Sequence, residues 1–384
     1  MKKKTMVGIS IMISAFAFGL NMVGISPVLG ILNEKYSSYG TSTVQLLQTV
    51  QYLLIIVGSL MLGWLTTKIS KKKIMMLGLL IIGICGTIPF FIDNFMILLL
   101  LRFLIGFGFG IMGPMNTAII TEFVEPEERA PFMGLHVVGM GLGTMICNLL
   151  GGVFAGMGYR YFFLVYVIAF AAMAAIWFTL KETPPVTNEK SSDMKMNKIV
   201  YGLCFASFAH TLFINAYSTN IGIYILKNIT DNPSATGIVT ASNAAFALLV
   251  GLTFGKIAGF LKNFTLPFSL FAAAVGYGTL LIVPGMAGVY IASALCGVSL
   301  SCFMAMASLV LSISVKKEAV AKASGVFSIV GSIGGFIAPV VLGGGARMLG
   351  ENSAKNQFIV AFIGMLIFAV IVTFITMKPK KEEK

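Results

Sequence analysis

Charged residues are scarce in this sequence of 384 residues. They make up 11% of the chain, whereas hydrophobic residues make up 57%. A soluble domain carries about 25% charged residues, because water must wet its surface. The charges are too few to cover a water-facing surface. The composition therefore argues against a soluble protein and predicts that the outer surface contacts lipid.

Catalytic and metal-binding motifs are also lacking. The five cysteines lie in apolar runs without metal-ligand spacing, which favours a packing role over a disulfide framework or a zinc site. No nucleophile–base–acid set or phosphate loop stands out. Gly106-x-Gly108-x-Gly110 falls inside an apolar run and indicates packing rather than nucleotide binding. The sequence thus predicts no enzyme, no cofactor and no metal site.

The net charge of +13 does not indicate a nucleic-acid partner. The lysines form short clusters between apolar runs, and no basic stripe alternates with aromatic residues along a soluble element. We therefore expect the lipid bilayer, rather than a nucleic acid, to be the main partner of this surface.

Apolar runs of about 20 residues, the length of a helix that crosses a bilayer, occur twelve times. The basic start and first run resemble a signal peptide, but no small-residue cleavage site follows, so we expect a retained first helix. The predicted fold is an all-α membrane protein with spans near 6–30, 44–66, 74–92, 96–120, 132–156, 161–180, 199–226, 237–258, 264–284, 286–312, 324–346 and 357–377.

The distribution of lysine and arginine predicts the orientation. If both termini are cytoplasmic, 21 of the 27 Lys and Arg residues lie in inner segments and Arg102 lies inside a span. This asymmetry favours a multi-pass protein of the cytoplasmic membrane with both termini inside. The five outer residues are Lys35, Arg160, Lys227, Arg347 and Lys355.

The sequence divides into two halves that resemble each other weakly. The longest polar connection predicts a six-helix bundle over 1–180, a cytoplasmic linker over 181–198 and a second six-helix bundle over 199–384. Repeated halves suit a transporter that rocks one half against the other around a central site. Gly134, Gly143 and Gly152 recur at one constant offset as Gly325, Gly334 and Gly343.

Two spans carry a face of small residues. Small residues let helix backbones approach closely in lipid, where no hydrophobic force draws helices together. Such a face is either a seam along which helices slide or static packing, and the sequence leaves both open. The faces are Gly139, Gly143, Cys147 and Gly151 in the fifth span, and Gly331, Gly335, Pro339 and Gly343 in the eleventh.

Four stretches together resemble the major facilitator superfamily over essentially the whole chain. They are "GWLTTKISKKK" (63–73), similar to that family's loop between helices two and three; "RFLIGFGFG" (102–110), similar to its fourth-helix pattern; "EFVEPEERAPFMG" (122–134), similar to its loop before helix five; and "GYRYFF" (158–163), similar to its turn opening helix six. The resemblance implies two pseudo-symmetric six-helix bundles and secondary transport by alternating access.

The fifth span resembles the pattern of the family's antiporters, although Cys147–Asn148 replaces its Gly-Pro pair. This resemblance slightly favours efflux over uptake. In the loop after the second span, Thr67 stands at the acidic position and Ser70 at the second glycine, while the basic residues are retained. The family pattern implies conformational roles for Gly63, Lys68, Lys71 and Lys72 in this loop, beside the two small-residue faces.

The sequence places none of its fourteen acidic residues near the middle of a span. Buried carboxylates are the usual proton carriers of membrane pumps. A protein that moves protons would need another group here, and Glu34 and Glu122, near span ends, are the closest substitutes.

Arg102 is the only permanent charge near the middle of a predicted span, and two roles are open for it. It either hydrogen-bonds backbone carbonyls and amide side chains that pin the first half, or attracts an anionic substrate. His210 is the better titratable candidate, although a lone membrane histidine is more often a packed hydrogen-bonding residue.

Polar side chains in the spans are candidate substrate ligands, with interhelical hydrogen bonding as the alternative. Asn21 and Asn215 occupy corresponding places in the two halves, on helices that line the pathway in the resembling family. The candidate substrate-binding residues are Asn21, Gln48, Arg102, His210, Asn215, Tyr217 and Asn243.

The function predicted from these patterns is a secondary active transporter of a small amphipathic or weakly anionic organic solute. It would act as a monomer, with protons or another ion as coupling partner. An ion-independent uniporter or anion exchanger is the alternative, suggested by the missing mid-span acids. A non-transporting membrane sensor on the same scaffold is a further alternative.

Overall fold

The computed structural model describes residues 2–123, 129–182, 184–185, 197–315 and 320–376, and these contain helices and no strand. Ten helical segments are long and apolar enough to cross a membrane. One of them, Ser234–Ile282, holds two successive helices, and the shorter apolar stretch Met6–Leu20 lies in the first helix. The described residues therefore contain the twelve predicted helical spans.

The first six spans, here called the first half, contain several interrupted helices. They are α1 (Lys2–Val23) with α2 (Ser26–Lys35), α3 (Thr41–Thr49) with α4 (Gln51–Lys68), α5 (Lys71–Thr87), α6 (Phe95–Phe123), α7 (Arg129–Met157), and the 3₁₀ turn η4 (Tyr161–Tyr166) with α8 (Val167–Thr179). Short 3₁₀ turns η1 (Ser37–Tyr39) and η2 (Ile88–Phe90) lie in its connections.

The last six spans, here called the second half, are longer single helices. A turn at Pro284–Gly285 separates the predicted spans 264–284 and 286–312, because α11 ends at Ile282 and Gly285 has a φ of +71°. The helices are α9 (Lys198–Asn228), α10 (Ser234–Leu261), α11 (Thr265–Ile282), α12 (Gly285–Ser314), α13 (Val320–Met348) and α14 (Ala354–Thr376), with the turn η5 (Lys262–Phe264) before α11.

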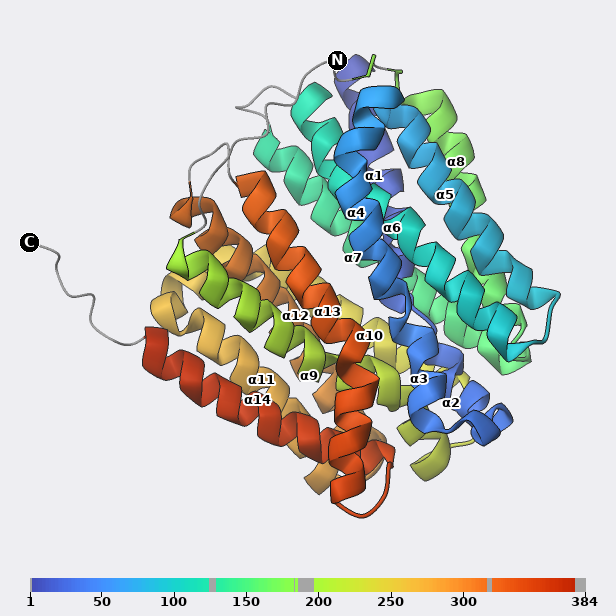
Figure 1. Ribbon diagram of the computed structural model, residues 1–384, viewed down its shortest axis with the longest axis vertical. Coiled ribbons are helices and arrows are strands. Elements are labelled where there is room, and N and C mark those ends of the chain that lie inside the picture. The colour runs from blue at the N-terminus through green and yellow to red at the C-terminus, as the bar shows by residue number, and fades with distance from the viewer. Residues whose placement is uncertain (1, 124–128, 183, 186–196, 316–319, 377–384) are drawn as a thin grey trace, which may run out of the picture.

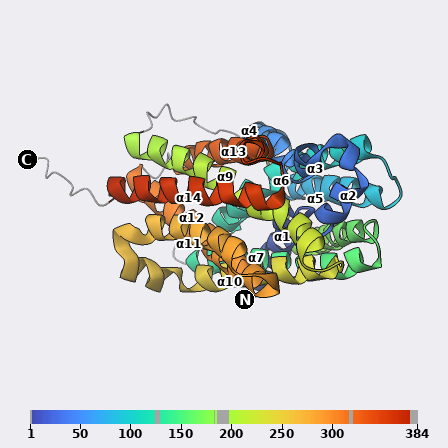
Figure 2. The same cartoon turned by 90° about the horizontal axis from the view of Figure 1, so that it is seen from below.

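The two halves contact each other more closely at one end than at the other. We call the helix ends near Asp93 the Asp93 end and those near Lys71 the Lys71 end. In Figure 1 the two sets of helices meet at the lower right, around α2 and α3, and run apart toward the upper left. Figure 2 shows α7 beside α10 on one side of the contact and α4 beside α13 on the other. At the closer end, α2 packs against α9.

The predicted span over 6–30 is divided at Gly24, whereas the predicted span over 44–66 runs as one segment, Thr41–Lys68, with a one-residue turn at Val50. Gly24 adopts a φ of +56°, which only glycine takes at low cost, so α1 ends before it and α2 begins at Ser26. The Ile25 N–H at this break donates to Gln48 Oε1 at 2.7 Å. Val50 separates α3 from α4. A glycine among 42 glycines, and a valine, carry no sequence signal for such breaks.

Equivalent glycines hold each half together. A Cβ at Gly143 would collide with the carbonyl of Phe16, where α7 packs on α1. A Cβ at Gly334 would collide with the carbonyl of Phe208, where α13 packs on α9. The structure thus places the Gly139–Gly143–Gly151 face mainly against the first span of its own half.

Another pair of glycines joins the two halves. A Cβ added at Gly152 of α7 would lie 2.7 Å from the Cα of Gly237 of α10. Gly335 of α13 contacts the ring of Tyr52 of α4, also across the halves. The second small-residue face therefore contacts both halves, since Gly331 lies against Ser207 of α9.

We expect Gly143→Ala to destabilise the protein, because the added methyl group has no space beside the Phe16 carbonyl. Overpacking of this kind costs about 1–3 kcal/mol. Thermal unfolding of the purified protein measures the effect, with Gly202→Ala as the control, since nothing lies within 4 Å of a Cβ at Gly202. Equal melting temperatures for the two variants would contradict the close packing of α7 on α1.

Candidate functional site

Arg102 lies buried in α6 with its donors engaged by the first half. The side chain is 1% exposed. Its Nε donates to the Leu47 carbonyl at 3.0 Å, and its Nη2 donates to Gln51 Oε1 at 3.3 Å. Its Nη1 donates to the hydroxyl of Tyr166 at 2.6 Å, which in turn donates to the Gly24 carbonyl at 3.0 Å.

These bonds connect Arg102 to both helix breaks. Gly24 ends α1, and Leu47 lies in the last turn of α3, where backbone carbonyls lack helical partners. A buried charge needs acceptors, and an interrupted helix in lipid needs donors. Arg102 meets both needs, directly at Leu47 and through Tyr166 at Gly24.

The glycines that follow Arg102 bring α6 close to its neighbours. A Cβ at Gly110 would lie 2.5 Å from the Ile55 carbonyl of α4, and one at Gly108 would lie 2.8 Å from the Gly78 carbonyl of α5. The 102–110 stretch therefore presents glycine to two helices, in line with the packing interpretation of these glycines.

The second half has an uncharged counterpart of this node. Ser293 of α12 lies 191 residues after Arg102, and Val239 lies 192 after Leu47. Ser293 Oγ donates to the Val239 carbonyl at 2.6 Å, as Arg102 donates to Leu47. Tyr217 and Asn243, both predicted as substrate ligands, meet here, with Tyr217 Oη 2.7 Å from Ser293 Oγ and Asn243 Nδ2 donating to the Ser293 carbonyl at 2.7 Å.

His210 lies apart from this node but on the same helix, α9. Its ring is buried and stacks on Phe303 at 4.0 Å between centroids, with Nε2 3.2 Å from Ser299 Oγ. The imidazole therefore packs between α9 and α12, inside the second half.

Asn215 is the predicted ligand that reaches the other half. Its Nδ2 donates to the Thr211 carbonyl at 2.7 Å, and its side chain lies close enough to interact with the hydroxyl of Tyr52 of α4. The sequence analysis did not identify Tyr52, because nothing in an apolar helix indicates which aromatic residue faces the other half. Asn21 lies in α1, but its side chain is outside the described part of the structure.

The predicted loop residues lie at the Lys71 end. Lys71 Nζ is 2.5 Å from Glu122 Oε2, and Lys73 Nζ is 3.0 Å from Glu182 Oε1. Lys72 donates to the Trp177 carbonyl at 2.6 Å and lies over its ring, whereas Gly63 precedes the end of α4 and Lys68 is exposed. The bond from Lys73, aided by Ser70, lowers the pKa of Glu182. The acidic partners of these lysines are therefore Glu122 and Glu182, from other segments, and not residue 67, where the family pattern has its acid.

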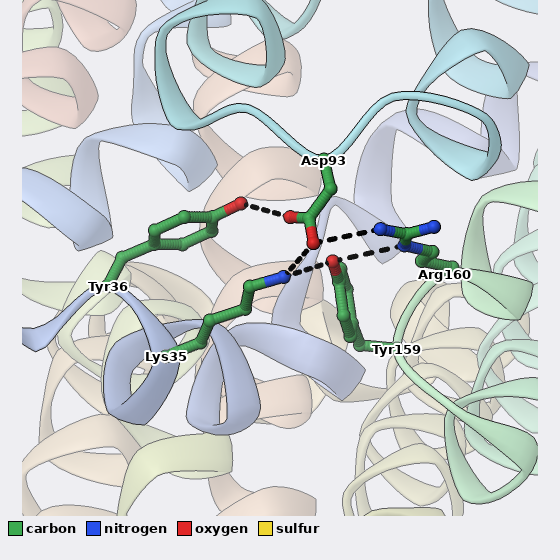
Figure 3. Close-up of polar contacts among 5 residues, drawn as sticks. All are labelled: Lys35, Tyr36, Asp93, Tyr159 and Arg160. Atoms are coloured by element: carbon green, nitrogen blue, oxygen red, sulfur yellow. Dashed lines mark hydrogen bonds and ion pairs between the residues drawn. The ribbon is translucent and has the colours of Figure 1, made fainter.

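The opposite end of the first half carries a cluster around Asp93 (Figure 3). Lys35 and Arg160 both bind Asp93 Oδ2, the latter at 2.9 Å, and the hydroxyl of Tyr36 donates to Oδ1 at 2.7 Å. Tyr159 accepts from Lys35 at 2.5 Å. Sequence analysis missed this cluster, because its residues come from three separate connections.

The cluster favours the ionised carboxylate. Burial opposes ionisation of Asp93, but the bonds from Lys35, Tyr36 and Arg160 outweigh it and hold the pKa of Asp93 well below its ordinary value. Burial and the bond to Asp93 raise the pKa of the Tyr36 hydroxyl. The cluster thus ties α2 to the connections before α6 and after α7.

Asp93→Asn should lower the thermal stability of the protein at pH 7. A lowered folded-state pKa gives stability that is present above the unfolded pKa of about 3.9 and lost as pH falls through the folded value. The melting-temperature difference between the two proteins should therefore be constant from pH 7 to 5 and shrink below about pH 4. A difference that shrinks between pH 7 and 5 would contradict the assigned ion pairs.

The chain is similar in sequence to an anion transporter and to a multidrug resistance protein. The chain is 26% identical over 184 residues to probable anion transporter 6 of Oryza sativa, covering 43% of each chain. It is 25% identical over 205 residues to multidrug resistance protein 2 of Bacillus subtilis, covering 50% of this chain and 51% of that one. The matched regions thus span about half or less of these relatives.

A solved structure matches over nearly the whole chain. It is a bacterial homolog of the human lysosomal transporter Spinster in an inward-facing, occupied conformation, with a TM-score of 0.77, 16% identity and coverage of 98% of this chain and 97% of that one. The sequence profile of the Major Facilitator Superfamily matches residues 11–200 and 203–384. With twelve spans in two similar bundles and a profile match in each half, the chain belongs to the major facilitator superfamily.

Proposed function

We propose that this protein is a secondary active transporter that works by alternating access. The observation that carries the proposal is the one-sided contact between two similar bundles, close at the Asp93 end and divergent toward the Lys71 end (Figure 1). A transporter that rocks its halves around a central site must pass through such an arrangement. The close backbone contacts at Gly143 and Gly334 keep each half intact while the halves move.

The proposed orientation follows from the lysine distribution, with the Lys71 end and both termini at the cytoplasmic face of the cell membrane. The arrangement described here is then open to the cytoplasm and closed to the outside. The division at 181–198 and the monomeric state remain predictions of the sequence.

The solute that fits best is small, organic, and uncharged or weakly anionic. Tyr52 and Asn215, which meet between the halves, offer a hydroxyl and an amide to a polar group. The acids of the described residues lie at helix ends or in connections, so no carboxylate there favours a cation. The positive charge of Arg102 favours an anion electrostatically, although its donors already bind the first half. Efflux is the favoured direction because of the fifth-span pattern.

An ion-independent uniporter or anion exchanger is the second candidate. It is favoured by the absence of mid-span carboxylates in the described residues and by the buried setting of His210, which stacks on Phe303. A coupled carrier would need a titratable group that alternates between the two sides.

Flux into proteoliposomes tests transport and its coupling. With a panel of organic anions and neutral amphipathic compounds, we expect accumulation of at least one compound under an imposed gradient. A protonophore should abolish accumulation if protons drive transport, whereas a uniporter or exchanger should keep its exchange rate. Absence of movement for the whole panel under every gradient would contradict the transporter proposal.

Arg102→Ala should abolish flux and also lower the melting temperature. The change leaves the Leu47 carbonyl and Gln51 without their donor at the helix breaks, at a cost of about 1–3 kcal/mol for each unpaired buried group. Arg102→Lys keeps the charge but cannot reach all three partners at once, so we expect only partial recovery. Loss of flux with an unchanged melting temperature would instead indicate that Arg102 acts on the substrate alone.

A further inference from the structure

Three buried amides from three spans meet at the Asp93 end. Gln45 of α3, Asn220 of α9 and Gln357 of α14 are each 0% exposed. Gln45 Nε2 donates to Asn220 Oδ1 at 2.7 Å, and Gln357 Nε2 donates to Gln45 Oε1 at 3.2 Å. Asn220 Nδ2 donates to Gln357 Oε1 at 2.8 Å, which closes the triangle.

This triangle joins the two halves, because Gln45 belongs to the first and the other two belong to the second. Further uncharged bonds join the two halves nearby. Asn352 accepts from Gln357 at 2.8 Å and donates to Ser42 of the first half at 3.0 Å. The hydroxyl of Ser26 in α2 binds the Ser218 carbonyl of α9.

Ion pairs contribute nothing to this contact within the described residues. The pairs found there, made by Asp93, Glu122 and Glu182, do not join the two halves. The charged side chains at the helix ends around the triangle are exposed, and none has a hydrogen bond to it: Glu34, Lys35, Lys227, Arg347, Glu351 and Lys355. The buried Arg102 of α6, which packs on α3, binds Leu47, Gln51 and Tyr166 instead. Tyr224 of α9 donates instead to the Leu280 carbonyl at 3.3 Å.

We propose that Gln45, Asn220 and Gln357 form an uncharged latch that closes the Asp93 end, so that its opening is independent of pH. The proposal rests on the alternating movement of the halves. Amides do not titrate, and in the open state water replaces each partner, so the closed and open states differ little in free energy. A latch of this kind can be released in every cycle without proton transfer.

Spin labels on Ser38→Cys and Lys355→Cys, one in each half at the Asp93 end, report the latch. Both positions are exposed and the five native cysteines are buried. Pulsed electron paramagnetic resonance in proteoliposomes measures the distance distribution between the two labels, which gives the ratio of closed to open populations. We expect the wild-type ratio to be constant from pH 5.5 to 8.5, and a shift with pH would overturn the proposal.

Gln357→Leu should lower the closed-to-open ratio about tenfold, equivalent to about 1.4 kcal/mol. Asn356→Leu is the matched control, because Asn356 is the preceding residue of α14 and its side chain binds the Glu351 carbonyl outside the latch. Equal ratios in the two variants would overturn the latch.

Gln45→Glu makes the latch respond to pH. A protonated carboxyl has nearly the shape of the amide, so at pH 5.5 the distance distribution should match wild type, which also shows that the variant folds. Ionisation at higher pH places an unpaired charge in a buried site, so the open population should rise with pH. A pH-independent distribution would overturn the proposal. These distances need no transported solute, so a failed flux assay with an intact pH response would contradict only the transport function.

Discussion

The buried guanidinium of Arg102 is the constraint on which the rest of the first half depends. A charge at this depth must find acceptors, and Arg102 takes them from the backbone at Leu47 and, through Tyr166, at Gly24. The helix breaks supply the carbonyls that the charge requires. The two elements that follow or precede these breaks, α2 and α3, contact the second half, so the bonds of Arg102 lie next to the part of the first half that closes the Asp93 end.

The contacts within each half differ in kind from the contacts between the two halves. Within each half, a glycine meets a backbone carbonyl of the first span of that half, at Gly143 and at Gly334, so no side chain intervenes. Between the halves, contact rests on Gly152 against Gly237, on Tyr52 with Asn215, and on the latch amides. Ser293 occupies the place of Arg102 in the second half, where α9 and α10 are continuous and a hydroxyl is sufficient.

Sequence patterns predicted the spans, the two bundles and the equivalent glycines, because span length, turn chemistry and the repeat offset are local properties. They did not predict the breaks at Gly24 and Val50, since the side chains that bind the freed carbonyls there, Arg102 and Tyr166, belong to other spans. The Asp93 cluster and the latch were missed for a related reason: Lys35, Asp93 and Arg160, or Gln45, Asn220 and Gln357, become neighbours only after folding. Which amide faces the other half is likewise decided by tertiary packing. Asn215 interacts with Tyr52 of the first half, whereas Asn243 binds Ser293 within the second half.

The most direct test of the account measures two distances between the halves in one membrane sample, one at the Asp93 end and one at the Lys71 end. If the halves rock as rigid bodies, every condition that lengthens the first distance shortens the second, and pairs of labels within one half stay constant. Distances that lengthen together, or a change confined to a pair within one half, would contradict the movement on which the proposed transport depends.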